Sequence, residues 1–156
     1  MLIFAKSVTL LIVLLLTISC SSDNSTDSTS ILPSEVQDCI TSTGDSKVNG
    51  TVNFLEFVEF TNNTYAVIQL LDDSIADTGA IIISQSCLNK ALSTPFDFEI
   101  EYNQNQIQSK NSYSVSVYIY QLNENGKYIN SYITDVIFPV ITQGFGSTVE
   151  ITVIGI

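Results

Sequence analysis

Apolar residues recur at every second position along most of the chain from residue 48 onward, which is the spacing of a β-strand with one buried face. Residues 96–102 place every apolar side chain on one face and every carboxylate on the other. Such a strand lies with one face in a core and the other in water. No stretch of this region carries a convincing helical stripe, so we expect an all-β fold.

The alternation, together with runs rich in β-branched and aromatic residues, predicts about seven short strands. The runs are residues 48–60, 65–71, 80–84, 96–102, 113–120, 127–140 and 149–153, each bounded by Gly, Asn, Asp or Pro. Short strands at roughly ten-residue spacing favour a single antiparallel β-sandwich, Ig-like or transthyretin-like, over a closed barrel.

One turn is identifiable from the sequence alone. Asn125-Gly126 separates the fifth run from the sixth. This dipeptide supplies the positive φ values that a type I′ turn requires, so the two strands should pair antiparallel.

The first twenty residues indicate export and a lipid anchor. One charge at Lys6 precedes an apolar run over residues 8–18, which is too short to span a bilayer and is typical of a signal-peptide core. The run ends at Thr17-Ile18-Ser19-Cys20, which resembles a lipobox. That resemblance implies removal of residues 1–19 and acylation of Cys20, giving a membrane anchor. The alternative is an ordinary secretory signal in which Cys20 is a free thiol.

The composition then changes along the mature chain. We expect residues 20–31, the lipidated cysteine and a Ser/Thr/Asp/Asn-rich stretch, to be a disordered tether, because they are too polar to pack. Residues 32–46 are a lead-in segment, and residues 47–156 are long enough for one domain with one core. Ser21 follows the cysteine, which favours the outer membrane over retention at the inner membrane. The domain should face the periplasm, with the cell surface as the alternative.

Charge and composition narrow the function. The chain has 5 Lys+Arg against 16 Asp+Glu, a formal net charge of −11, so nucleic acid, which needs a cationic footprint, is not an expected partner. Histidine is absent, and with it the commonest general base and transition-metal ligand. We therefore expect no enzyme activity, no cofactor and no metal site.

Two cysteines remain for the folded part, Cys39 and Cys87. An oxidising compartment lets such a pair persist as a disulfide, which would close a loop of about 50 residues. A bridge would hold the lead-in segment against the strand at residues 80–84. The alternative is that Cys87 is simply a small buried hydrophobe.

A group of polar residues follows the second predicted strand: Asp72, Asp73, Ser74 and Asp77. Their oxygens could coordinate Ca²⁺, but the spacing lacks the Gly and the distal Glu of a known calcium loop. We favour a structural role, in which Asp72 and Ser74 bind backbone amides of a turn and Asp77 caps the next connection.

Tyrosines form the best candidate binding patch. Tyr118 and Tyr120 share the face of the fifth strand opposite its core face, and Tyr128 and Tyr132 could lie near them across the hairpin. Exposed rings of this kind bind extended peptides or glycans. Cross-strand packing in a second layer is the alternative.

Several segments, taken in order, resemble the YbaY family of bacterial lipoproteins, which also includes the YscW-type pilotins of type III secretion. The similar segments are residues 48–52, 68–77, which fit the pattern V-x-L-x-D-x-S-x-A-D, 95–98, 113–115, 125–127 and 138–144. The resemblance implies a β-sandwich lipoprotein facing the periplasm. Such a protein would be non-catalytic and would bind, escort or localise another envelope protein through its sandwich. The alternative is a surface-exposed module that binds a glycan or another substrate.

Overall fold

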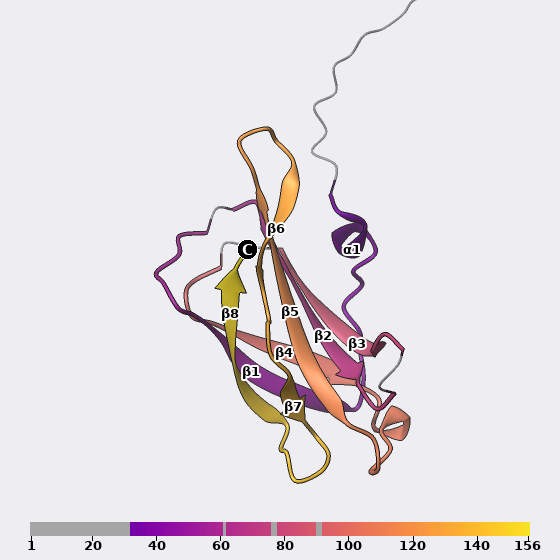
Figure 1. The fold of residues 1–156 in the computed structure, drawn as a ribbon. Coiled ribbons are helices and arrows are strands. Elements are labelled where there is room, and N and C mark those ends of the chain that lie inside the picture. The colour runs from indigo at the N-terminus through magenta and orange to yellow at the C-terminus, as the bar shows by residue number, and fades with distance from the viewer. Residues whose placement is uncertain (1–31, 61, 76–77, 90–91) are drawn as a thin grey trace, which may run out of the picture.

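The computed structural model describes residues 32–156 except 61, 76–77 and 90–91 (Figure 1). In this part of the chain the strands are β1 (Ser46–Phe54), β2 (Thr64–Asp72), β3 (Ile81–Asn89), β4 (Phe96–Tyr102), β5 (Tyr113–Leu122), β6 (Tyr128–Ile133), β7 (Phe138–Val140) and β8 (Thr148–Gly155). The helices are short: α1 (Ser34–Gln37) and the 3-10 helix η1 (Gln104–Gln106). The predicted all-β class is confirmed.

Each of the seven predicted runs overlaps a strand, and the run at 127–140 overlaps two. The run at 80–84 was too short, since β3 continues to Asn89. β6 and β7 are separate because residues 135–137 leave the ladder and are exposed. The backbone N–H of Thr134 still donates to the carbonyl of Val117 at 3.1 Å, a normal hydrogen-bond length. Alternation of side chains could not reveal this break, because the apolar pattern continues through it.

The strands form one continuous sheet in the order β3-β2-β5-β6-β8-β1-β4, and β7 pairs with β5. The ladders are antiparallel except that between β1 and β8, which is parallel. The strands β3-β2-β5-β6 and β8-β1-β4 would be two separate layers, but β6 pairs with β8 and joins them. The paired residues are Tyr132 with Gly155 and Ile133 with Ile154. The result is a nearly closed, barrel-like sheet in place of the predicted sandwich of separate antiparallel sheets. Strand periodicity predicts which face is buried but does not predict which strands pair.

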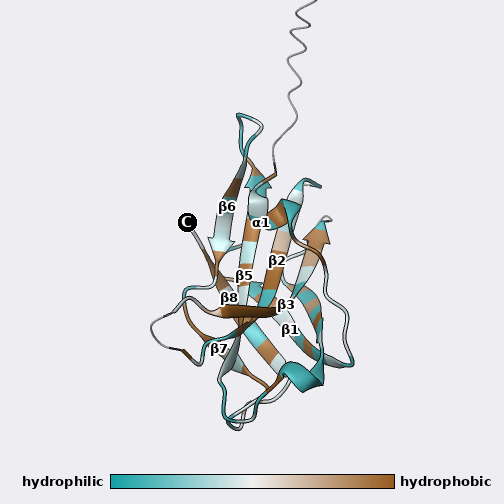
Figure 2. Cartoon of the chain, turned by 90° about the vertical axis from the view of Figure 1, so that its right-hand side faces the viewer, coloured by the Kyte–Doolittle hydropathy of each residue, from teal (hydrophilic) through white to brown (hydrophobic). Residues whose placement is uncertain are grey.

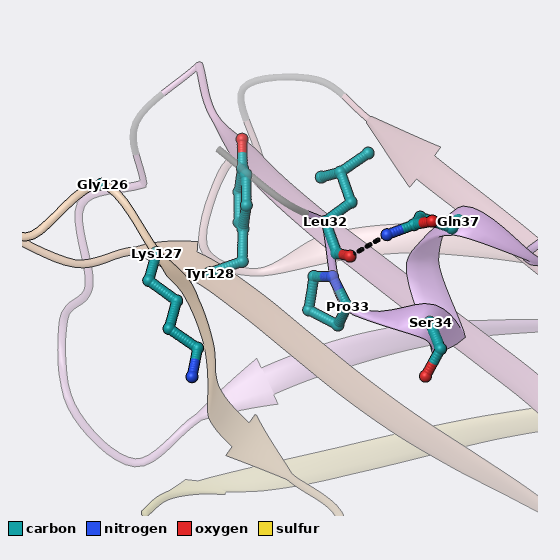
Figure 3. Close-up of a pocket in the computed structure, with 7 residues that line it drawn as sticks. All are labelled: Leu32, Pro33, Ser34, Gln37, Gly126, Lys127 and Tyr128. Carbon is teal, nitrogen blue, oxygen red and sulfur yellow. Dashed lines mark hydrogen bonds between the residues drawn. The ribbon is translucent and has the colours of Figure 1, made fainter. Parts of the chain in front are cut away.

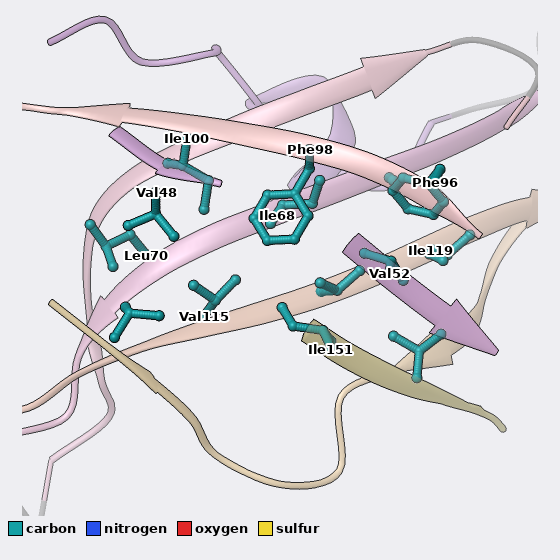
Figure 4. Close-up of a cluster of buried hydrophobic side chains, with 14 of the residues drawn as sticks. Val48, Val52, Ile68, Leu70, Phe96, Phe98, Ile100, Val115, Ile119 and Ile151 are labelled. Carbon is teal, nitrogen blue, oxygen red and sulfur yellow. The ribbon is translucent and has the colours of Figure 1, made fainter. Parts of the chain in front are cut away.

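The core lies inside the rolled sheet (Figure 4). On β4 the predicted alternation holds, because Phe96, Phe98 and Ile100 are buried while Asp97 and Glu99 are exposed. Figure 2 shows the same alternation of hydrophobic and hydrophilic positions along several strands. Burying each large apolar side chain contributes about 1.5–3 kcal/mol. The side chains from the other strands that meet β4 in the core include Val48, Val52, Ile68, Leu70, Val115, Val117, Ile119, Ile151 and Val153.

The β5–β6 hairpin forms as predicted, but through a different turn. Leu122 pairs with Tyr128, so the connection is longer than the two residues of a type I′ turn. Gly126 has a φ of +72°, whereas Asn125 is not among the described residues with positive φ. The N–H of Gly126 donates to the carbonyl of Asn123 at 3.0 Å. This is a type I turn followed by a left-handed glycine, and the type I′ prediction is wrong.

Candidate functional site

The lead-in segment lies on the outer face of the sheet, over part of the predicted tyrosine patch. Val36 of α1 packs in a cluster with Val67, Tyr120 and Tyr128. Both tyrosines are 6% exposed. The ring of Tyr128 also meets that of Tyr65 edge-on, with centroids 5.2 Å apart. These rings therefore serve first to hold α1 on the sheet.

Tyr132 lies on the opposite face from Tyr128. A regular strand would place residues four apart on the same side. The β5–β6 ladder shifts register here, since Ile119 pairs with Tyr132 while Tyr120 pairs with Asn130. The extra residue turns Tyr132 inward, as a β-bulge does. Its ring packs edge-on against Phe54 and Phe60, at 5.4 and 6.0 Å between centroids. The structure thus divides the four tyrosines between two faces.

The two tyrosines that α1 covers, Tyr120 and Tyr128, have raised pKa values. Burial raises the pKa of Tyr120 to about 12, and the nearby Glu35 and Tyr118 add to the increase. Burial also raises the pKa of Tyr128, with a contribution from Tyr65. Both phenols are neutral at physiological pH, which suits side chains that pack under a helix.

A groove of about 560 Å³ opens between α1 and the tip of the β5–β6 hairpin (Figure 3). Its wall on the α1 side is stabilised by a hydrogen bond from the side-chain amide of Gln37 to the carbonyl of Leu32. Lys127 supplies the one cation of the lining. The lining residues are Leu32, Pro33, Ser34, Gln37, Gly126, Lys127 and Tyr128. A groove of this composition suits a small apolar group.

Cys39 and Cys87 are joined by a disulfide, with their Cα atoms 5.9 Å apart. Next to it, Ser42 N donates to the carbonyl of Gln85 at 2.8 Å, and Gln85 N donates to Ser42 Oγ at 3.1 Å. Cys87 N donates to Thr41 Oγ1 at 3.0 Å. These bonds occupy the outer edge of β3, which would otherwise offer unpaired backbone groups to another strand. The disulfide therefore attaches the lead-in segment to β3, and the hydrogen bonds of that segment cover the edge of the strand.

Asp72 and Ser74 form a polar corner at the end of β2. Asp72 Oδ1 accepts hydrogen bonds from Ser74 N at 2.9 Å and from Ser74 Oγ. Asp72 Oδ2 accepts one from Asn111 Nδ2 at 2.8 Å. Burial by itself would raise the pKa of Asp72, but the hydrogen bonds from Ser74 and Asn111 outweigh it and hold the pKa below its usual value. The carboxylate is thus used to fix the turn.

A loop far along the chain meets the same corner. Thr142 Oγ1 donates to the carbonyl of Asn111 at 2.7 Å, and Gln143 Nε2 donates to Ser112 Oγ at 2.9 Å. Ile141 and Gln143 have φ values of 72° and 57°, which are costly for residues other than glycine. Segments 68–77 and 138–144, noted in the sequence, therefore meet through residues 111–112. Sequence reasoning missed this partnership because no spacing connects the three segments.

Some predicted sites are not reached by the structure. Cys20 and the rest of residues 1–31 lie outside the described residues, as does Asp77. Within the described part of the chain, no group of three or more His, Cys, Asp or Glu could hold a metal ion. In the same part, no helix is long and apolar enough to cross a membrane.

One exposed loop was not predicted. Residues 48–60 read as one strand, but β1 ends at Phe54. In the loop that follows, Leu55 and Phe57 are 76% and 81% exposed. Phe54 and Phe60 instead turn inward and pack edge-on, 5.3 Å between centroids. The loop is as rich in β-forming apolar residues as the strand, and this concealed the end of the strand.

Comparison with known proteins identifies the family. The model of the family described as type III secretion system lipoprotein chaperone (YscW) matches residues 43–153. The chain belongs to the YscW family. The match begins just before β1 and ends within β8, so it covers β1 to β7 and most of β8. The resemblance to YscW-type pilotins that the sequence motifs indicated is confirmed.

A solved structure of a pilotin is also similar to this chain. The structure of an alternative pilotin from the type II secretion system of Vibrio cholerae is similar to this one, with a TM-score of 0.58 and 27% sequence identity. The similarity covers 71% of this chain and 96% of that chain. No curated protein matches the chain. Both similarities are to proteins that serve secretion systems.

Proposed function

We propose that this YscW-family chain is a non-catalytic envelope lipoprotein that binds an envelope component of a secretion system and escorts or localises it. The observation that carries the proposal is the family match over residues 43–153, supported by the similarity to a pilotin. A family of lipoprotein chaperones acts by binding a client, which agrees with a chain that has no histidine.

The anchor is part of the proposal. Residues 1–19 are a signal peptide that is removed, Cys20 carries the acyl chains, and residues 21–31 tether the barrel at the periplasmic side of the outer membrane. The lipobox resemblance and the family's description as lipoproteins support this arrangement. Two or more acyl chains on one cysteine are sufficient for stable anchoring.

The charged outer face of the barrel supports recognition over bond chemistry. Glu99 and Glu101 lie beside each other on β4 and share Lys47, whose Nζ is 2.7 and 3.3 Å from their carboxylates. Asp97 accepts a hydrogen bond from Thr51 at 2.7 Å. These carboxylates stand on an exposed face, paired with neighbours, whereas an acid–base pair needs a cleft that holds a substrate.

The test compares cells with the wild-type chain, the Cys20→Ala chain and no chain. We expect the envelope component of the secretion system to reach the outer-membrane fraction with the wild type and to be mislocalised in the other two strains. Cys20→Ala should release the barrel from the membrane fraction. Correct localisation in the strain without the chain would overturn the proposal. Protease added to intact cells separates a periplasmic barrel, which is protected, from a surface-exposed one.

A further inference from the structure

The connection between β1 and β2 is unusually apolar for an exposed loop. Residues 54–60 read Phe-Leu-Glu-Phe-Val-Glu-Phe. Phe54 and Phe60 pack inward and complete the core at this end of the barrel. Leu55 and Phe57 do not contribute to that packing, since most of each side chain is in water. Large apolar side chains gathered on a surface mark interaction sites more often than chance exposure does.

Two hollows flank this loop and meet at its first residues. One, of about 370 Å³, has Phe54, Leu55 and Glu56 on one side and Tyr132 and residues 153–155 on the other. The second, of about 220 Å³, lies between residues 53–57 and Thr94-Pro95. Phe54, Leu55 and Glu56 line both hollows. A bound segment could therefore place one apolar side chain in each hollow, on the two sides of the exposed Leu55 and Glu56.

The negative charge of this loop indicates what kind of partner it can bind. Glu56 and Glu59 are exposed on the same loop, and the chain as a whole carries a net charge of −11. Anionic lipid headgroups would be repelled by these carboxylates. A second copy of the chain would bring the same two carboxylates against their equivalents, which disfavours self-association. A protein segment with apolar anchors bordered by Lys or Arg fits both features.

The loop is also well placed to bind a partner while the chain is anchored. Figure 1 shows it on the side of the barrel away from α1. We propose that the surface of residues 54–60 and its two hollows binds a cationic amphipathic segment of the envelope component. This inference rests on the proposed function, since it assigns the surface through which that component is held.

The test places a photo-crosslinking amino acid at position 57 of the full anchored chain in producing cells. We expect an adduct with the envelope component, through a segment that has Lys or Arg beside apolar residues. Glu56→Lys with Glu59→Lys should reduce the adduct tenfold or more. The control is the same amino acid at position 75, where Ile75 is 56% exposed at the opposite end of β2, and it should give no such adduct.

Four outcomes would overturn the inference. In three of them the adduct at position 57 forms with the wrong partner: a second copy of the chain, phospholipid, or a protein segment without basic residues. In the fourth, no adduct forms in cells that localise the component correctly. A Leu55→Ser, Phe57→Ser variant separates this inference from the proposed function. Suppose that removing the chain mislocalises the component while this variant, at normal abundance, still localises it correctly. In that case residues 54–60 are not the binding surface, and the proposed function stands. If removing the chain has no effect, the proposed function itself fails.

Discussion

Gly50 on β1 pairs with Phe98 on β4, and the Phe98 ring fills the space in which a side chain at position 50 would stand. A Cβ at position 50 would lie 2.6 Å from two carbons of that ring and would also meet the carbonyl oxygen of Val149 on β8. β1 lies between β4 and β8, so this glycine lets three strands and a core ring pack closely. The close approach explains a glycine in the interior of a strand, where it otherwise weakens the sheet.

Gly50→Ala should therefore lower the free energy of unfolding by about 3 kcal/mol, because the new methyl group overpacks against backbone and a buried ring. Urea unfolding of the exported chain carrying Cys20→Ala measures the change. Gly79→Ala is the matched control, since a Cβ at position 79 meets nothing within 4 Å. Equal effects of the two substitutions would contradict the packing argument.

The disulfide between Cys39 and Cys87 should be quantitative and stabilising. Its sequence separation of 48 residues corresponds to about 4 kcal/mol in the chain-entropy model. With Cys20→Ala, the unreduced, denatured chain should show no reactive thiol, and two after reduction. Replacing Cys39 and Cys87 together by serine should lower the free energy of unfolding by about 2–4 kcal/mol. Two thiols titrating before reduction would disprove the bridge.

Tyr120 should make the fold sensitive to alkaline pH. Its pKa in the folded chain is raised to about 12, mainly by burial, above the ordinary value of 10.0. The stability that depends on the neutral phenol is therefore complete below pH 10 and is lost as the pH rises through about 12. Unfolding free energies of the wild type and of Tyr120→Phe should differ in slope between pH 10 and 12, with the wild type falling more steeply. Parallel curves would contradict this.

Asp72 should show the opposite dependence in acid. Hydrogen bonds from Ser74 and Asn111 hold its pKa below the ordinary value of 3.8. Its contribution to stability is therefore present above that value and is lost as the pH falls through the lower, folded pKa. Asn111→Ala removes one donor, so NMR titration should find the pKa of Asp72 closer to its ordinary value. Asn105→Ala, an exposed asparagine in η1, should leave that pKa unchanged, and an equal shift would refute the role of Asn111.

A strained loop gives a further test of the polar corner. Thr142 Oγ1 donates to the carbonyl of Asn111 and helps to hold Ile141 at a positive φ. Thr142→Val keeps the shape but removes the donor, so we expect a loss of about 1–3 kcal/mol in unfolding free energy. Thr148→Val, at an exposed position of β8, should change it by less than about 0.5 kcal/mol. Equal losses would argue against the hydrogen bond.

The sequence by itself determined the strands and their buried faces, because side-chain alternation is a local property. Phe96, Phe98 and Ile100 are buried where the period places them. The order and spacing of several motifs, that at residues 68–77 among them, also indicated the family correctly, since motif order needs no knowledge of pairing. The same local signal failed where apolar residues serve a loop, as at Leu55 and Phe57.

Only the tertiary structure decided how the strands assemble. The parallel pairing of β1 with β8 joins residues about 100 apart, and no local pattern encodes it. The shift beside Ile119 sends Tyr132 into the core although its spacing from Tyr128 predicts the same face. The contact of Asn111 with Asp72 likewise joins segments that are distant in sequence. Each depends on register and closure, which are set by the packing of the whole sheet.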